Sequence, residues 1–192
     1  MSDDILSRLR PLIDAVERRL AEKKPVILAM DGMAASGKTT AAAALSDLWD
    51  APVVHMDDFY LPLPLRTTRR LAEPGGNVHY ERFAEEVLPG LRAGGDFAYR
   101  RFDCERMDLG GTVSIPAAAV LIVEGAYALH PRFGAYADVT AFFAVEPEEQ
   151  RRRVLARNGP ESWEAFRTRW IPMENAYHAA FGTRSRADFV IV

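Results

Sequence analysis

Short continuous runs of apolar residues alternate with stretches of helical periodicity along most of the chain. Apolar runs at 26–30, 120–123 and 139–145 predict strands that are covered on both faces of a sheet. The N-terminal segment instead repeats apolar residues every three or four positions, which predicts one buried helical face made of Leu6, Leu9, Ile13, Val16 and Leu20. Because proline lacks the N–H that a helix interior needs, Pro11 is expected to kink or divide this helix.

The remaining segments extend this alternation to the end of the chain. We predict further strands at 52–56, 97–102 and 188–192. Helices are predicted at 40–49, 80–91, 147–158 and 162–181, the last with an interruption at Pro172. The segment 61–79 is rich in proline and glycine and is predicted to be a long functional loop. Strands that alternate with helices indicate an α/β fold, with a mostly parallel central sheet and helices on both faces.

Composition and length limit the classes of protein to consider. The 192 residues favour a single domain over 1–192, and 48% hydrophobic with 27% charged residues are ordinary for a globular protein. The net charge of −3 gives no global basic footprint for nucleic acid or for an anionic membrane. No apolar stretch is long enough to span a bilayer, and no signal-peptide core follows the first residues. We therefore expect a cytoplasmic protein whose only cysteine is Cys104, and its oligomeric state stays open.

One glycine-rich motif carries most of the functional information. Residues 32–39 match the phosphate-binding pattern G-x-x-x-x-G-K-[ST] and lie between a predicted strand and a predicted helix. In that context, backbone N–H groups and a helix N-terminus point at one spot and bind a polyphosphate. Lys38 is one of three lysines among 24 basic residues, and its ammonium group is expected to serve the outer phosphates. The candidate ATP-binding residues here are Gly32, Ala34, Ala35, Ser36, Gly37, Lys38, Thr39 and Thr40.

Carboxylates follow two of the predicted strands at their carboxyl ends, where parallel α/β sheets bind ligands. Asp57 follows the strand at 52–56, and Glu124 follows the run at 120–123. Phosphoryl transfer needs Mg²⁺ and a carboxylate that orients or deprotonates the acceptor hydroxyl. We expect Asp57 to act as this base together with catalytic Lys38, and Glu124 to hold Mg²⁺ with the Thr39 hydroxyl. The alternatives are a turn or cap role for Asp57 and a surface salt bridge for Glu124.

An arginine-rich segment near 151–162 is predicted to form a short lid. Arg153 and Arg157 are four residues apart on one helical face, from which they could cover the ATP phosphates. The alternative is a solvated face on which Glu149 pairs with Arg153. The candidates for an acceptor pocket are Tyr60, His79, Tyr80, Tyr99 and Arg106, although a lone tyrosine or histidine is often a packing or surface residue.

Taken together, these motifs resemble the uridine kinase-like group of P-loop kinases, which also includes phosphoribulokinase, pantothenate kinase and nicotinamide riboside kinase. The likeness runs from residue 31 to the last predicted strand and includes the phosphate loop, a D-x-F-Y element at 57–60 and the Glu124-Gly125 pair. It implies a P-loop NTPase three-layer sandwich, ATP and Mg²⁺ as cofactors, Asp57 as the base and Glu124 at the metal site. Segment 99–106 is similar to a nucleoside-contacting segment of uridine–cytidine kinases, but Arg100 and Cys104 replace its aspartate and histidine.

The expected function is therefore ATP-dependent transfer of the γ-phosphoryl group to a hydroxyl, with the 5′-OH of a nucleoside such as uridine as the favoured acceptor. Because segment 99–106 matches only in part and the lid is short after Asn158, pantothenate, nicotinamide riboside and other alcohols stay open as acceptors. A nucleotide-dependent regulatory protein without kinase activity is a second alternative, although the chain lacks the N-K-x-D motif that reads guanine. An inactive relative of these kinases is a third.

Overall fold

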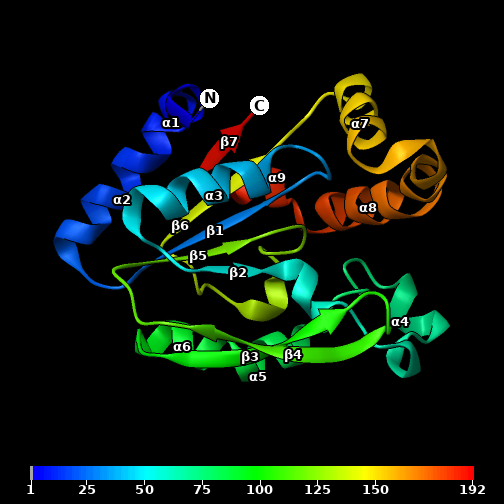
Figure 1. Cartoon of the computed structure of the whole chain (residues 1–192), viewed down its shortest axis with the longest axis horizontal. Coiled ribbons are helices and arrows are strands. Elements are labelled where there is room, and N and C mark those ends of the chain that lie inside the picture. Colours follow the sequence, from blue (N-terminus) through cyan, green and yellow to red (C-terminus); the bar gives the residue numbers. More distant parts are fainter. Residues whose placement is uncertain (1) are drawn as a thin grey trace.

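The computed structural model describes residues 2–192 and has a parallel sheet of five strands at its centre (Figure 1). The strands lie in the order β2–β5–β1–β6–β7, and every neighbouring pair is parallel. Their bounds are Val26–Gly32 for β1, Val53–His55 for β2, Val120–Glu124 for β5, Val139–Phe143 for β6 and Phe189–Ile191 for β7. The predicted α/β architecture is thus confirmed.

The inner strands explain why the chain carries continuous apolar runs. Every residue of β1 and of β5 is buried, because both strands lie inside the sheet and helices cover its two faces. Parallel pairing also sets the register at the carboxyl edge. Met30 of β1 lies opposite Glu124 of β5, and His55 of β2 lies opposite the same glutamate. The ends of three strands therefore meet at the edge where α/β sheets bind ligands.

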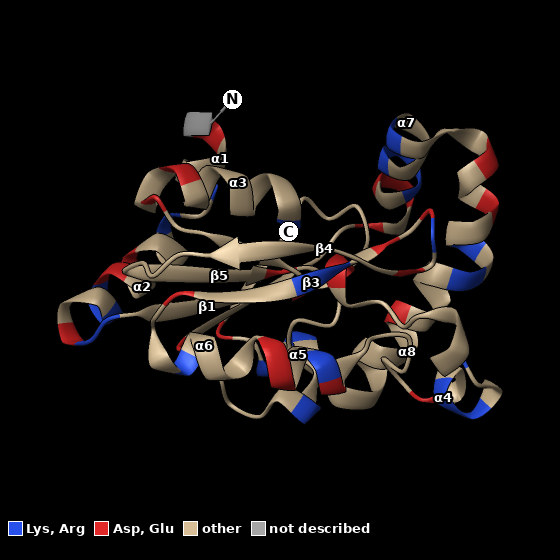
Figure 2. Cartoon of the chain, turned by 60° about the horizontal axis from the view of Figure 1, so that its bottom comes forward, with Lys and Arg blue, Asp and Glu red and all other residues tan. Residues whose placement is uncertain are grey.

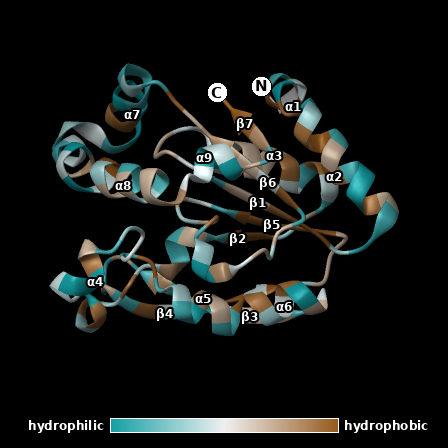
Figure 3. Cartoon of the chain, turned by 180° about the vertical axis from the view of Figure 1, so that it is seen from behind, coloured by the Kyte–Doolittle hydropathy of each residue, from teal (hydrophilic) through white to brown (hydrophobic). Residues whose placement is uncertain are grey.

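Helices pack on the two faces of the sheet through two hydrophobic clusters. One cluster joins the sheet to α1 (Ser2–Arg8), α2 (Arg10–Glu22) and α3 (Lys38–Trp49). The other joins it to α5 (Tyr80–Glu86) and α6 (Leu88–Ala93). Figure 3 shows the hydrophobic strands enclosed between these helices. Among the described residues, none of the helices combines the length with the hydropathy that a membrane-spanning helix requires.

The amphipathic N-terminal segment folds as its periodicity predicts. Leu9, Ile13 and Val16 are buried on the sheet, and the other two residues of the predicted face are partly buried beside them. The break that Pro11 favours falls at Leu9, between α1 and α2. Pro11 lies at the start of α2, where a missing N–H costs no hydrogen bond.

A two-stranded antiparallel hairpin lies beside the main sheet, on the side of β2 (Figure 1). It consists of β3 (Phe97–Asp103) and β4 (Asp108–Ile115). The sequence predicts the first strand but not the second, because the Gly110-Gly111 pair lowers strand propensity and only Ile115 in β4 is buried. Ile115 and Tyr99 attach the hairpin to the hydrophobic cluster that also holds α5 and α6.

The segments that follow β2 are more irregular than the sequence suggests. The predicted loop 61–79 contains a 3₁₀ turn at Leu63–Leu65 and the short helix α4 (Thr68–Ala72). The single helix predicted at 80–91 is divided at Val87 into α5 and α6, because a proline in the first turn of α6 cannot continue the hydrogen bonding of α5. Phe83, Val87 and Leu91, spaced four residues apart, are nevertheless buried on one side of both helices.

The last part of the chain forms a helical projection at the carboxyl edge of the sheet (Figure 1). Helix α7 (Pro147–Ala165) begins at residue 147, as the sequence predicts, and is broken at Gly159, where φ is +79°. A π-helical turn at Phe166–Trp170 leads into α8 (Ile171–Phe181), and α9 (Thr183–Arg186) precedes β7. Figure 2 shows positive and negative residues following one another along α7, which is the helix that carries the predicted lid arginines.

Candidate active site

The phosphate-binding motif forms the turn between β1 and α3. Gly32 has φ +138°, and a Cβ on it would lie 2.1 Å from the carbonyl oxygen of Phe143, so a side chain there would collide with β6. Gly37 precedes the first residue of α3 and has φ +98°, a conformation that glycine adopts without steric cost. The two motif glycines therefore fix where the loop leaves the sheet and where the helix N-terminus begins.

Lys38 lies across this loop. Its Nζ donates to the carbonyl oxygens of Gly32 and Met33, each at 2.8 Å, and the residue is 7% exposed. These two bonds hold the ammonium group at the wall of a cavity of about 580 Å³ in front of the loop. A positive charge and the N-terminus of α3 thus face the same space, which suits an anion. We refer to this space as the central cavity.

The central cavity brings together most of the residues that the sequence predicts for the site. Its walls come from the loop, from the segments after β2 and β5, and from α7 and α8. The predicted residues on its lining are Ala34, Ala35, Ser36, Gly37, Lys38, Thr39, Thr40, Asp57, Tyr60, Glu124, Arg153 and Arg157. Gly32 is not on the lining; it is buried in β1, and its carbonyl oxygen binds the Lys38 ammonium.

Glu124 and Thr39 meet at the middle of the carboxyl edge. Glu124 is 4% exposed, and the Thr39 hydroxyl lies 3.4 Å from each of its carboxylate oxygens. On the other side, Nδ1 of His55 lies 2.6 Å from Oε1 of Glu124, and this hydrogen bond raises the pKa of His55. A carboxylate and a hydroxyl are hard oxygen donors of the kind that Mg²⁺ prefers. The pair is therefore chemically suited to the predicted metal site.

The donor set at this edge is small. Among residues 2–192, no group of three or more His, Cys, Asp or Glu side chains is arranged to hold a metal ion. Mg²⁺ in nucleotide sites commonly takes one or two protein oxygens, and phosphate oxygens and water complete its coordination. One carboxylate and one hydroxyl next to a phosphate loop match this mode of binding.

Asp57 lies on a 3₁₀ turn, Met56–Phe59, directly after β2. Its side chain lines the central cavity, and the Tyr60 hydroxyl donates to Oδ1 at 2.8 Å. Burial and the nearby Asp57 charge raise the pKa of Tyr60, so the phenol remains a hydrogen-bond donor at neutral pH. One carboxylate oxygen of Asp57 is thereby held by a neighbouring side chain at the cavity wall.

The arginines of the predicted lid reach the central cavity from α7. Arg153 pairs with Glu149 at 2.6 Å, and its Nη1 also donates to the carbonyl oxygen of Ala35 in the loop at 3.2 Å. The pairing considered from the sequence is therefore present, together with a contact to the phosphate loop. Nε of Arg157 donates to the side-chain oxygen of Asn158 at 2.7 Å. Both arginines line the central cavity.

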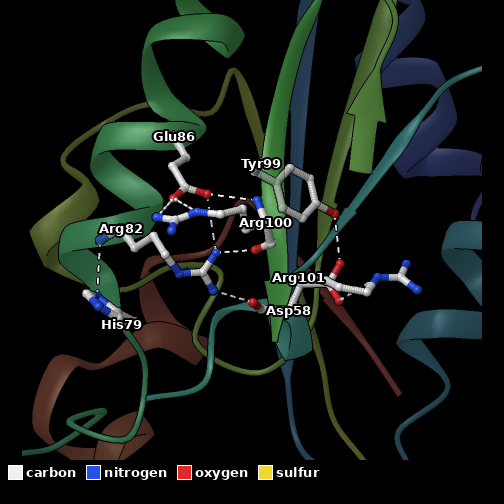
Figure 4. Close-up of polar contacts among 7 residues, drawn as sticks. All are labelled: Asp58, His79, Arg82, Glu86, Tyr99, Arg100 and Arg101. Carbon is white, nitrogen blue, oxygen red and sulfur yellow. Dashed lines mark hydrogen bonds and ion pairs between the residues drawn. The ribbon is translucent and has the colours of Figure 1, made fainter. Parts of the chain in front are cut away.

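Two of the residues predicted for the acceptor pocket are instead part of a polar network away from the cavity lining (Figure 4). Tyr99 is 2% exposed and donates from its hydroxyl to Oδ2 of Asp58 at 2.9 Å. His79 is the N-cap of α5 and accepts the backbone N–H of Arg82. The Arg82 guanidinium in turn binds the carbonyl oxygens of Asp58 and Arg100. This network ties α5, β3 and the 3₁₀ turn together, and neither Tyr99 nor His79 is on the cavity lining.

Two further predicted acceptor residues lie elsewhere. Tyr80 is 6% exposed and is enclosed by the Arg70 guanidinium, 3.6 Å from its ring centroid, and by the stacked ring of His130. Arg106 is exposed in the turn between β3 and β4. Tyr60 is therefore the one predicted acceptor residue that the structure places at the central cavity.

Six lining residues are absent from the sequence prediction: Gly125, Ala126, Arg152, Ala156, Phe166 and Glu174. Glu174 is the most unusual of them, because it is a carboxylate only 8% exposed in the first turn of α8. Its Oε2 accepts the N–H of Ala34 at 2.7 Å, and burial raises its pKa to about 7. In the sequence it is one polar position of a predicted helix, and only tertiary packing decides which way that position faces.

Comparison with solved structures shows which proteins share this fold. No family model matches the sequence. A candidate uridine kinase from Bacillus stearothermophilus superposes with a TM-score of 0.69 at 18% identity, covering 95% of this chain and 100% of that one. For a candidate fructose transport system kinase from Silicibacter sp. TM1040 the TM-score is 0.71 at 24% identity, with 95% and 98% covered. For YFH7 from Saccharomyces cerevisiae, a candidate P-loop kinase with a circular permutation, it is 0.64 at 12% identity, with 99% and 96% covered.

These similarities concern the fold, because fewer than a quarter of the residues are identical in each comparison. They extend over almost the whole chain and over almost the whole of each solved protein. The chain therefore has the three-layer α/β fold of the uridine kinase-like and other P-loop kinases, as its sequence resemblance predicts.

Proposed function

We propose that the protein is a kinase that uses MgATP and transfers the γ-phosphoryl group to a hydroxyl of a small molecule. The observation that carries the proposal is that one cavity is lined by the anion-binding loop with Lys38, by the Thr39–Glu124 oxygen pair and by Asp57. Phosphoryl transfer needs these three functions within reach of one another, namely a phosphate clamp, a metal site and a carboxylate for the acceptor.

The donor nucleotide is proposed to extend away from Asp57 along the loop. A second cavity, of about 190 Å³, adjoins the loop next to α1 and β7. It shares Ser36, Gly37, Thr40 and Arg153 with the central cavity, and the rest of its wall is mostly apolar, with Ile5, Leu9, Ala41, Phe143, Ile191 and Val192. An apolar pocket beside a phosphate site suits a nucleotide base. With the base there, the terminal phosphate points into the central cavity.

Asp57 is proposed to accept the proton of the acceptor hydroxyl. Tyr60 holds one of its oxygens, which leaves the other to face an alcohol bound in the central cavity. Lys38 and the lid arginines are placed to stabilise the charge on the transferring group. Thr39 and Glu124 would hold Mg²⁺, which neutralises phosphate charge when bound.

The acceptor is proposed to be a small alcohol that binds beside Tyr60 and Asp57 in the central cavity. A nucleoside such as uridine is the first candidate because of the sequence resemblance. Tyr60 is the one predicted acceptor residue on the cavity lining, so the geometry supports an alcohol without selecting among nucleosides, pantothenate, nicotinamide riboside and similar compounds.

We further propose that residues 1–192 act as one kinase domain and that 151–162 form its lid. Two observations support the lid. Arg153 and Arg157 of α7 line the central cavity, and the helix is broken at Gly159, where its axis can change direction. A segment anchored at 147–150 and interrupted at 159 has the form of a flap over the phosphate loop.

An acceptor panel tests the proposed reaction. Purified protein is mixed with MgATP and with uridine, cytidine, pantothenate, nicotinamide riboside or a simple polyol in turn. A coupled-enzyme spectrophotometric assay follows ADP formation, and mass spectrometry identifies the product. At least one alcohol should accelerate ADP formation by about tenfold or more over the acceptor-free rate and gain one phosphoryl group. A protein that binds MgATP but phosphorylates none of these alcohols would favour the regulatory alternative.

A further inference from the structure

A single residue of the phosphate loop, Ala34, is held through both of its backbone polar groups by side chains of α7 and α8. The N–H of Ala34 donates to Oε2 of Glu174 at 2.7 Å, and the carbonyl oxygen of Ala34 accepts from Nε2 of Gln150 at 2.9 Å. Gln150 belongs to the first turn of α7 and Glu174 to the first turn of α8. The two contacts therefore come from residues that flank the lid segment 151–162 in the sequence.

Both side chains are buried. Gln150 is 3% exposed and Glu174 is 8% exposed. Burying an amide or a carboxylate is unfavourable unless it forms hydrogen bonds, so each of these side chains depends on its bond to Ala34. Within the described residues, neither side chain makes a hydrogen bond other than the one to Ala34. Neither residue carries a signal in the sequence that distinguishes it from other polar positions of a helix.

The residue after Ala34 in the loop has a strained backbone conformation. Ala35 has φ +56°, in the left-handed region that residues with a Cβ rarely adopt. Strained backbone of this kind persists where the surrounding structure over-determines it. Here the restraints are the two bonds to Ala34 and a third contact, from Nη1 of Arg153 to the carbonyl oxygen of Ala35. Three side chains of the lid region thus hold two consecutive residues of the loop.

We propose that Gln150 and Glu174 are positioning residues, which keep the phosphate loop in its nucleotide-binding shape and tie both ends of the lid to it. The inference rests on the proposed kinase function, since it concerns how the same site grips its donor. It assigns these residues no contact with the reacting atoms. Its consequence is that loop geometry and lid position change together, because α7 and α8 hold the same loop residue.

The test compares side chains that keep or lose the bond to Ala34. Glu174→Gln keeps an oxygen that accepts the Ala34 N–H, whereas Glu174→Met and Gln150→Met remove their bonds at similar volume. Calorimetry should show that the dissociation constant of MgATP rises by about tenfold in each methionine variant, because one lost hydrogen bond in a preorganised site changes a binding constant by about a factor of ten. In Glu174→Gln it should stay within about twofold of wild type. The double methionine variant should lose less than the product of the two single losses, since both residues act on the backbone of Ala34.

A second readout does not depend on the nucleotide. Hydrogen exchange of the backbone amides at 34–37, measured by NMR in the ligand-free protein, should be faster in the methionine variants than in wild type and unchanged in Glu174→Gln. Glu164→Gln is the matched control, because Glu164 lies in α7, is exposed and pairs with Arg167 on the outside of the lid. It should leave both the loop amides and MgATP binding as they are. If Gln150→Met does not fold, Gln150→Leu removes the same donor without adding a charge.

The outcomes separate this inference from the function on which it rests. Wild-type loop exchange and wild-type MgATP affinity in folded methionine variants would overturn the positioning role and leave the kinase proposal intact. A lower melting temperature with unchanged loop exchange would also overturn it, because the residues would then act only on global stability. Faster loop exchange in a protein whose wild type fails to bind MgATP would support the positioning role and contradict the kinase proposal.

Discussion

Glu174 is a carboxylate in a place where a charge is costly. Burial raises its pKa from the ordinary 4.5 to about 7, and the charges that face it partly cancel: Lys38 of α3 lowers the pKa, whereas Asp31 of β1 and Asp57 of the 3₁₀ turn raise it. Below pH 4.5 the group is protonated in both the folded and the unfolded chain. Between pH 4.5 and 7 the folded chain keeps a proton that the unfolded chain has lost, and above pH 7 the folded chain carries a buried charge.

The stability of the protein should therefore fall as the pH rises through this window. Glu174→Gln has no ionisable group at this position. The unfolding free energy of the variant minus that of wild type should therefore rise by roughly 2–3 kcal/mol between pH 5 and pH 8. Urea unfolding at the two pH values measures this difference. Glu164→Gln, at an exposed position of the same lid region, should show no comparable growth. An advantage of Glu174→Gln that does not change with pH would mean that the native carboxylate titrates normally.

Individual residues also show where sequence reasoning reaches its limit. Lys38, Thr39, Asp57 and Glu124 could be located because each follows a predicted strand or a glycine motif directly, and parallel strands bring such positions to one edge. Tyr99 could not be placed, because its direction depends on Asp58, which lies 41 residues earlier in the chain. A tyrosine in a motif can equally well face a ligand or a neighbouring carboxylate.

At the scale of elements, the close packing of β1 on β6 controls where the phosphate loop begins. A Cβ on Gly32 would meet backbone atoms of Phe143, which cannot move aside as a side chain can. The elements that the sequence predicted well are those with a continuous apolar run or a clear helical face, such as β1 and α2. Strand β4 was missed because its partner, β3, rather than its own composition, makes it a strand.

Gly32→Ala should disrupt this junction. We expect a loss of unfolding free energy of about 3 kcal/mol or more, because overpacking and an unfavourable φ act together. Gly95→Ala is the control, since Gly95 has ordinary φ and no atom within 4 Å of an added Cβ. Chemical unfolding of both variants measures the difference. Equal stability of the two would show that β1 and β6 can separate at Gly32 without cost.

At the scale of the whole molecule, the central cavity is assembled from four distant segments. They are the phosphate loop, the turn at 57–60, the start of the segment after β5, and the α7–α8 region. The first three were predictable because each is a local motif at a strand end. The buried contacts of Gln150 and Glu174 were not, because they depend on how the lid helices return to the loop.

Asp57 is the carboxylate proposed to face the acceptor, and the proposed phosphoryl transfer depends on it most directly. Asp57→Asn keeps an oxygen for the Tyr60 hydroxyl and removes the base. Asp58→Asn is the matched control, because the Asp58 side chain binds Tyr99 and does not line the central cavity. The most direct measurement is kcat with the acceptor found in the panel, alongside the dissociation constant of MgATP.

Asp57→Asn should lower kcat by about a hundredfold to ten-thousandfold and leave MgATP binding within about twofold of wild type, while Asp58→Asn keeps most of the activity. Wild-type turnover by folded Asp57→Asn would contradict the proposed role of Asp57 as the base, because the carboxylate beside the phosphate loop would then have no part in the transfer.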